Sequence, residues 1–199
     1  NNFTDEDFRS LFNRNDLTIS VKAALVFKGS QNIWKPESGW GKMLSQEEML
    51  DVYNEVKRSG LINFDILRNF HGTEIEEIYL DIVDFCEKNS KGNKPEVQNA
   101  LLNILMNNKG VTERVITKIY NMTKDKSIIK AIARYHNTPA SILRELLSLS
   151  REKKNGASMR RNIAFSYNIP SDMLEELSYD DAPNVRYQVA YHPLVSIDI

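Results

Sequence analysis

The sequence predicts an all-α protein in which a non-repetitive helical region leads into a short α-solenoid. Three stretches, at residues 128–133, 159–164 and 185–190, share one pattern: apolar residues at the first and fifth places, Ala at the sixth, and then a turn. The Ala residues stand 31 and 26 positions apart. A recurrence of that length indicates stacked helical units, because one such unit cannot bury its apolar face alone.

Each of the first two copies is followed by a second apolar helix. The turns end in Pro139 and Pro170, and proline fits the first turn of a helix, where the residue before it can act as a cap. Leucines then recur with the i, i+3 spacing of a buried helical face. They are Leu143, Leu146, Leu174 and Leu177.

A fourth, degenerate copy begins at Pro95, and its partner helix is expected at 112–122. We therefore divide the chain into residues 1–90 and a repeat region, 91–199, of about four units. The last unit is incomplete after His192-Pro193. An uncapped solenoid end exposes apolar surface, so either this end docks onto something, self-association included, or the chain has been trimmed.

The first 90 residues indicate helices without repetition. Thr4 opens a helix to Asn13, and a capping box at Ser45 opens another that ends near Gly60. A second box is expected at Thr73, ahead of an amphipathic helix.

Two further segments of this region leave alternatives open. Residues 16–27 form a helix or, alternatively, contain a short strand. The stretch 28–44 is expected to be an irregular loop that holds both tryptophans, Trp34 and Trp40. These rings either anchor the loop to the core or present an aromatic hot spot to a partner.

Composition excludes several classes of protein. The single cysteine, Cys86, excludes an internal disulfide and any multi-cysteine metal centre. No apolar run reaches the roughly 18–20 residues that span a bilayer, and the acidic N-terminal stretch has no signal-peptide pattern. We expect a cytoplasmic protein without a cofactor or membrane contact. Abundant Asn, Lys and Ile hint at an AT-rich bacterial or phage genome.

The net charge of −1 conceals a strong asymmetry along the chain. Residues 1–108 and 162–199 each carry a net charge of −5, whereas residues 109–161 carry +9. This basic block is either a solvated surface whose charge the acidic N-terminal region neutralises, or a cationic strip that binds the phosphates of a nucleic acid. The candidate binding residues are its cations and the two tryptophans: Lys118, Lys126, Lys130, Arg134, Lys153, Lys154, Arg160, Arg161, Trp34 and Trp40.

The last copy of the pattern carries a family resemblance. The run Val185-Arg186-Tyr187-Gln188-Val189-Ala190-Tyr191-His192-Pro193, preceded by two leucines and an acidic pair, resembles the leucine-rich-repeat variant family, a relative of HEAT-type repeats. The resemblance covers roughly residues 95–199 and implies a right-handed superhelix of paired helices. Some members carry an iron–sulfur cluster on a multi-cysteine segment, which one cysteine cannot supply.

Arg186 follows the acidic pair Asp180 and Asp181 within the last unit. We expect an Asp–Arg pair that fixes one unit to the next, with partner recognition by Arg186 as the alternative. Arg160 occupies the same register one unit earlier.

The function that the sequence favours is non-enzymatic binding through the curved face of the solenoid, with another protein as partner. Nucleic-acid backbone binding through the basic block is the alternative. A lesser alternative is a DNA-processing enzyme, since HEAT-like-repeat DNA glycosylases exist, although no catalytic residue can be mapped onto this chain. No metal-ligand, P-loop or nucleophile-elbow motif occurs in the sequence.

Overall fold

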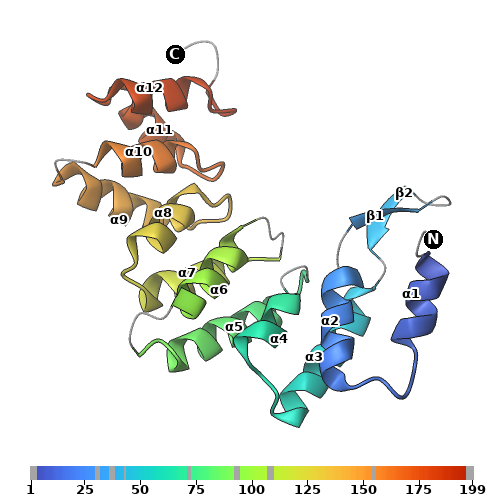
Figure 1. Cartoon of the computed structure of the whole chain (residues 1–199). Coiled ribbons are helices and arrows are strands. Elements are labelled where there is room, and N and C mark those ends of the chain that lie inside the picture. Colours follow the sequence, from blue (N-terminus) through green and yellow to red (C-terminus); the bar gives the residue numbers. More distant parts are fainter. Residues whose placement is uncertain are drawn as a thin grey trace. The chain divides into compact units, whose positions relative to one another are not determined.

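A computed structural model describes residues 4–29, 32–35, 39–42, 44–70, 73–91, 95–106, 110–153 and 156–195. Over these residues the fold is helical apart from one two-stranded hairpin, which agrees with the predicted all-α class (Figure 1). The chain divides into two compact units, Asn1–Gly110 and Val111–Ile199. The division follows the first predicted repeat helix, so that helix belongs to the first unit. No described helix is long and apolar enough to cross a bilayer.

The first unit contains six α-helices, a 3-10 helix and the hairpin among its described residues. The elements are α1 (Asp5–Phe12), α2 (Ile19–Gly29), β1 (Asn32–Lys35), β2 (Gly39–Lys42), α3 (Gln46–Ser59), α4 (Phe64–Leu67), η1 (Arg68–Phe70), α5 (Glu76–Lys88) and α6 (Pro95–Leu105). α2 packs on α3 and η1, and α5 packs on α6. Tyr53 and Phe70 meet edge to face in the core, with ring centroids 5.1 Å apart.

Two predicted helix starts of this unit, at Thr4 and at the capping box of Ser45, are confirmed, and Thr4 also forms a capping box. Thr4 accepts the N–H of Asp7, and Ser45 accepts that of Glu48, while each carboxylate returns to the cap backbone. Gly60 ends α3 in the left-handed conformation, with φ of 72°, which favours glycine because it has no Cβ. The ambiguous segment 16–27 is helical from Ile19 onward.

Two other expectations for this unit are wrong. The stretch 28–44 contains an antiparallel hairpin in which Trp34 pairs with Trp40; its four-residue strands are too short to give a clear period-2 signal. The expected box at Thr73 is absent: α5 begins at Glu76 without a side-chain cap. Thr73 is buried, and its carbonyl oxygen accepts the hydroxyl of Tyr79 at 2.6 Å, so tertiary contacts displace the local motif.

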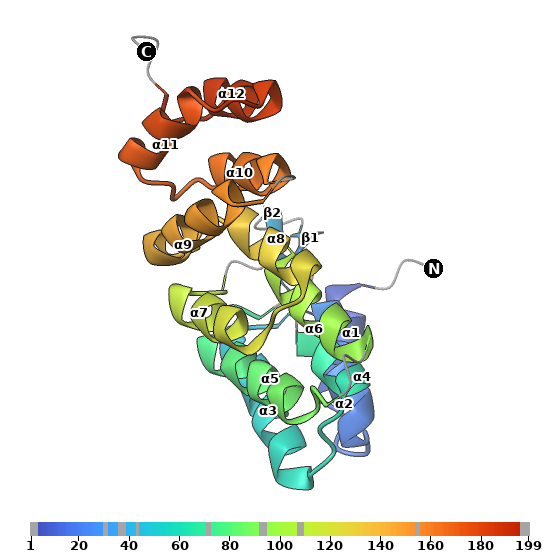
Figure 2. The ribbon, with the colours of Figure 1, turned by 90° about the vertical axis from the view of Figure 1, so that its left-hand side faces the viewer.

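Among its described residues, the second unit consists of α-helices joined by turns. Its helices are α7 (Glu113–Met122), α8 (Lys126–Arg134), α9 (Ala140–Arg151), α10 (Ala157–Ala164), α11 (Ser171–Ser178) and α12 (Pro183–Ala190). Figure 2 shows α8, α10 and α12 in one column and α7, α9 and α11 in another. α10 contacts both α8 and α12, and these three helices hold the three copies of the sequence pattern.

Burial in this unit follows the predicted apolar positions. The stripe Leu143, Leu146, Leu174 and Leu177 is buried, as are Ala133 and Ala164, whereas Ala190 is exposed. The small Ala lets neighbouring helices of the column approach closely. The ion pair between Arg144 and Asp172, at 2.8 Å, joins α9 to α11.

The turns between the columns differ from the expected capping. Pro139 and Pro170 stand at the N-cap positions of α9 and α11, and neither helix has a side-chain cap. Thr138, the expected cap of α9, instead donates its hydroxyl to the carbonyl oxygen of Ile132 at 2.6 Å. Because Thr138 is fully buried, its hydroxyl needs a partner, and it finds one in the preceding helix.

Candidate functional site

One face of the second unit repeats along the column of α8, α10 and α12. The residues three places before each Ala of the pattern are Lys130, Arg161 and Tyr187, and those one place after it are Arg134, Phe165 and Tyr191; all six are exposed. Residues four apart lie on the same side of a helix. We call these six residues the cation–aromatic face.

Ring contacts connect the residues of this face. The guanidinium of Arg134 lies 4.5 Å from the ring centroid of Phe165, which joins α8 to α10. The rings of Tyr187 and Tyr191 are 4.6 Å apart on α12. Between these pairs, Tyr167 lies 6.5 Å from Phe165 and 6.3 Å from His192. Four exposed rings, those of Phe165, Tyr167, Tyr187 and Tyr191, therefore lie on α12 and on the turns that follow α10 and α12.

A buried chain of hydrogen bonds holds the turns beneath this face. Tyr135, Ser166 and His192 each stand two places after the Ala of their copy, and all three are buried. The Ser166 hydroxyl donates to the Tyr135 carbonyl oxygen at 3.1 Å, and His192 Nε2 lies 3.0 Å from the Ser166 carbonyl oxygen. His192 Nδ1 accepts the N–H of Leu194 at 3.2 Å, so the proton is on Nε2. We call this chain the turn ladder.

A cavity of about 460 Å³ lies between α7, α8, α9 and the start of α10. Four lysines, Lys124, Lys126, Lys130 and Lys153, line it together with an apolar wall. The apolar residues are Ile129, Leu146, Leu149 and Met159. We call it the lysine cavity. α9 forms much of this wall, and with 12 residues it is longer than α11, which has 8.

The lysine cavity also holds one carboxylate, that of Glu145. The Tyr120 hydroxyl donates a hydrogen bond to it, and the pKa of Tyr120 rises to about 12, first because of burial and then because of this bond and the negative charge. Neither residue was a candidate from the sequence. They stand on α7 and α9, and no local pattern indicates that these helices bring them together.

The lysine cavity and the cation–aromatic face together take up five of the predicted binding residues. Lys126 and Lys153 line the cavity, Lys130 belongs to both sites, and Arg134 and Arg161 lie on the face. The cavity lining also includes Lys124, which was not a candidate from the sequence.

The other predicted residues lie elsewhere. Lys118 is half-buried on α7 and is not among the residues that line the cavity. Trp34 and Trp40 pair across the hairpin of the first unit. Lys154 lies outside the described residues.

Arg160 has a structural partner. Its guanidinium forms two hydrogen bonds with the Asp180 carboxylate, at 2.5 and 3.1 Å, and a third with the Ser150 carbonyl oxygen at 3.3 Å. It therefore ties α10 to the end of α9 and to the loop before α12. Burial raises the pKa of Asp180, but hydrogen bonds from Arg160 and Ala182, with the charges of Arg160 and Arg186, outweigh burial and lower it.

The expected carboxylate partner of Arg186 is thus taken by Arg160. Arg186 instead donates to the carbonyl oxygens of Asp180 and Asp181, at 2.6 and 3.0 Å, and is exposed. The Asp–Arg pair that joins successive units exists, but with the arginine of the earlier unit. The Asp180 carboxylate also accepts the Ala182 N–H at 2.9 Å, which directs it away from Arg186.

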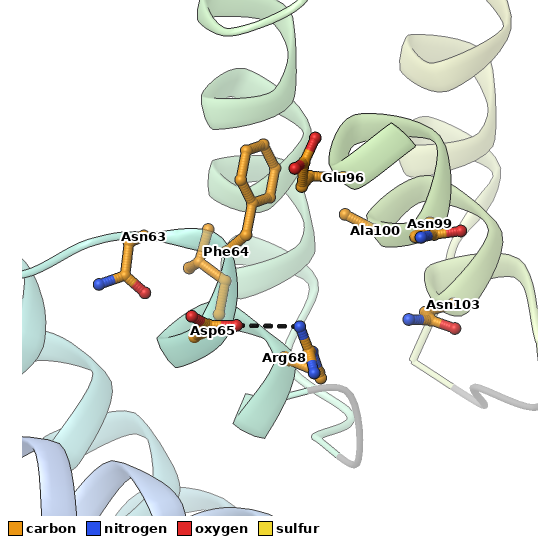
Figure 3. Close-up of a pocket in the computed structure, with 9 residues that line it drawn as sticks. Asn63, Phe64, Asp65, Arg68, Glu96, Asn99, Ala100 and Asn103 are labelled. Carbon is orange, nitrogen blue, oxygen red and sulfur yellow. Dashed lines mark hydrogen bonds and ion pairs between the residues drawn. The ribbon is translucent and has the colours of Figure 1, made fainter. Parts of the chain in front are cut away.

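A second hollow, of about 600 Å³, lies in the first unit between α4, η1 and α6. Figure 3 shows the ion pair of Asp65 and Arg68 on one side and Asn99 and Asn103 along α6 on the other. The Asp65–Arg68 distance is 2.9 Å. Its described lining carries two carboxylates, Asp65 and Glu96, and one guanidinium, Arg68, so it offers no surplus of positive charge to an anion.

Two further observations concern catalysis. In the described part of the chain, no three His, Cys, Asp or Glu side chains are placed to hold a metal ion. A cleft that combined a carboxylate, a tryptophan and cations of the basic block 109–161 would favour the alternative of a DNA-processing enzyme. The lysine cavity has Glu145 and lysines, but the aromatic residue in its described lining is Tyr120.

Comparison with protein families, curated proteins and solved structures gives no match to this chain.

Proposed function

We propose that the second unit is a short right-handed α-solenoid of the leucine-rich-repeat variant or HEAT-like kind, and that the protein is a non-enzymatic scaffold. It binds another protein through the cation–aromatic face. The observation that carries this proposal is the recurrence of exposed Lys, Arg and aromatic residues at equivalent positions of α8, α10 and α12. Stacked repeats place equivalent residues side by side, which creates an extended binding surface.

The chemistry of the face supports a protein partner. Tyr187 and Tyr191 are 64% and 69% exposed, and their rings lie together, with centroids 4.6 Å apart. Tyr and Arg are the residue types enriched at the energetic centres of protein interfaces. The turn ladder fixes the backbone below the face, so binding orders few additional groups.

The test compares the full-length protein with the double variant Tyr187→Ser and Tyr191→Ser. Each is immobilised and exposed to a cell extract, and the retained proteins are identified by mass spectrometry. Tyr179→Ser is the matched control, because Tyr179 is 79% exposed but lies outside the face. A partner retained by the wild type and the control but lost from the double variant is the expected result. Identical retention by all three proteins contradicts the proposal.

Nucleic-acid binding is the second candidate, and a specific observation favours it. Arg134 stacks on Phe165 next to Lys130 and Arg161, and cations beside exposed rings suit phosphates and stacked bases. Arg160 is left out of this surface because Asp180 occupies it.

Salt dependence separates the two candidates. A fluorescein-labelled oligothymidine is titrated with the full-length protein at several salt concentrations. Phosphate contacts make the logarithm of affinity fall linearly with the logarithm of salt concentration. Steeply salt-dependent binding that the Arg161→Gln variant weakens would replace the protein-partner proposal. A lack of binding at low salt removes the nucleic-acid alternative.

A further inference from the structure

We infer that the lysine cavity binds an acidic peptide segment through one apolar anchor side chain and its flanking carboxylates. The inference rests on the proposed function, since it names the chemistry of the protein partner at a second place on the same unit. It differs from the cation–aromatic face in residues and in mechanism, with Lys130 as the one shared residue.

The cavity wall suits an apolar side chain. Ile129, Leu146, Leu149 and Met159 line it, and Leu149 is 42% exposed. The volume of about 460 Å³ lies within the usual range of ligand pockets. Met159 adds a flexible, polarizable surface that adapts to different side chains. Covering this wall would remove apolar surface from water.

The cavity rim suits carboxylates. Its lysines come from three segments: the loop before α8, α8 itself and the loop after α9. No ion pair joins these four lysines to a described carboxylate, and the one carboxylate of the lining, Glu145, is bonded to Tyr120. The rim therefore carries an excess of positive charge beside the apolar wall.

The start of α10 adds to this preference. Gly156 and Ser158 line the cavity, and α10 has no side-chain cap. The N-terminal turn of a helix carries partial positive charge and N–H groups that attract anions. It supports a ligand carboxylate that the lysines already attract.

The arrangement favours a peptide over a compact phosphate or a nucleotide. Described lining residues include no arginine, the side chain whose planar fork matches phosphate. The lysines are spread around the rim: Lys126 and Lys130 are one helical turn apart, about 6 Å between Cβ atoms. Separate carboxylates along a chain meet such a rim better than one concentrated charge. The wall is aliphatic, whereas a base needs a ring to stack on.

The first test measures binding of a fluorescein-labelled peptide, Glu-Asp-Glu-Leu-Phe-Glu-Asp-Glu, to the full-length protein by fluorescence anisotropy. One comparison peptide replaces all acids by Gln and Asn, and another replaces Leu and Phe by Ser. We expect both to bind at least tenfold more weakly than the parent. Equal binding of the serine peptide would show simple charge attraction and overturn the inference.

The second test uses protein variants. The double variant Lys126→Gln and Lys153→Gln should raise the Kd of the parent peptide at least tenfold. The matched control, Lys88→Gln with Lys91→Gln, removes the same charge from exposed positions outside both the cavity and the cation–aromatic face and should change Kd less than twofold. Equal effects of the two double variants would contradict a localised site.

A third readout locates the ligand. With 13C-methyl methionine, the Met159 signal, assigned through Met159→Leu, should shift on addition of the peptide, while that of buried Met173 stays in place. An unmoved Met159 signal, or a larger shift with oligothymidine of equal charge, overturns the inference. If the peptide does not bind but Tyr187→Ser with Tyr191→Ser still abolishes partner capture, only the peptide site in the lysine cavity is excluded. If the peptide binds in the cavity but the double variant retains the same proteins as the wild type, only the proposed role of the cation–aromatic face is excluded.

Discussion

Arg160 matches the sequence pattern, but its guanidinium binds the Asp180 carboxylate and is half-buried, so it is not available to a partner. The sequence predicted an Asp–Arg pair here, which is present, but assigned it to Arg186 rather than Arg160. Both arginines occupy the same register, so the pattern alone cannot choose between them. The Asp180 carboxylate is turned by the Ala182 N–H and meets Arg160. Such a choice depends on side-chain direction within a loop, which composition and spacing do not encode.

The Arg160–Asp180 pair predicts an acid-sensitive second unit. The pKa of Asp180 is lowered in the folded protein, so its stabilisation is present above the pKa of about 3.9 of an unfolded Asp and is lost as pH falls through the lower folded pKa. Asp180→Asn should cost about 1.5–3 kcal/mol of unfolding free energy at pH 7. The difference from wild type should narrow below about pH 4.

Urea unfolding followed by circular dichroism from pH 3 to 7 measures this effect. Asp181→Asn is the control, because Asp181 is exposed and it is its backbone carbonyl oxygen that accepts the hydrogen bond from Arg186. A constant difference between Asp180→Asn and wild type over the whole pH range would exclude this role for the carboxylate.

Gly156 is required for space rather than for an unusual backbone angle. Its φ is −69°, which any residue adopts, but a Cβ there would overlap the carbonyl oxygen of Ser150. Gly156→Ala should therefore destabilise the second unit by about 1–3 kcal/mol, the usual cost of overpacking.

Hydrogen exchange of α9 and α10 peptides measures that loss. Gly60→Asn serves as the contrast, because Gly60 has positive φ and nothing within 4 Å of a Cβ, a situation that Asn tolerates. The substitution at Gly60 should leave exchange in α9 and α10 unchanged. Equal protection in Gly156→Ala and wild type would contradict the steric argument.

At the scale of elements, local signals were reliable where tertiary contacts agreed with them. The boxes at Thr4 and Ser45 cap their helices, and the predicted stripe of leucines is buried. Thr73 and Thr138 are also of a residue type that caps helices, but both are buried and neither caps the helix that follows it. Thr138 donates its hydroxyl to the carbonyl oxygen of Ile132 instead. The hairpin at Trp34 was missed because its strands are short.

The turn ladder predicts that His192 supports α12. His192→Ala leaves the Ser166 carbonyl oxygen and the Leu194 N–H without this partner, which should cost about 1–3 kcal/mol. Amide exchange in α12 should accelerate, whereas His136→Ala, at an exposed position, should have little effect. Unchanged exchange in α12 would show that the ladder does not hold this turn.

At the scale of the whole molecule, the described residues confirm the predicted helical class. The repeat region 91–199 stays a prediction, and the two compact units divide after Gly110. α6 matches the repeat pattern and yet belongs to the first unit. The lysine cavity was only partly foreseen: its cations cluster in the sequence, whereas Tyr120 of α7 and Glu145 of α9 come together only in the folded unit. Such meetings depend on helix orientation, which a hydrophobic pattern does not specify.

The reactivity of Cys86 reports on unfolding of the first unit alone, because residues 111–199 contain no cysteine. The thiol is fully buried, and burial raises its pKa to about 12, so thiolate is scarce at neutral pH. Dithionitrobenzoate should not label the native protein within minutes, but should label one thiol per chain in denaturing urea. Rapid labelling in native buffer would contradict this burial.

The extra length of α9 has a consequence for how such a protein can change. The steps of 31 and 26 residues differ mainly because α9 has 12 residues and α11 has 8, roughly one helical turn. Despite this difference, both ladder contacts reach the main-chain carbonyl oxygen at the equivalent position of the preceding copy. Insertion or deletion of one helical turn in a helix such as α9 or α11 can thus enlarge or remove a cavity beside it, while the hydrogen bonds between the buried turns are kept. Such changes offer a simple route to new binding specificities.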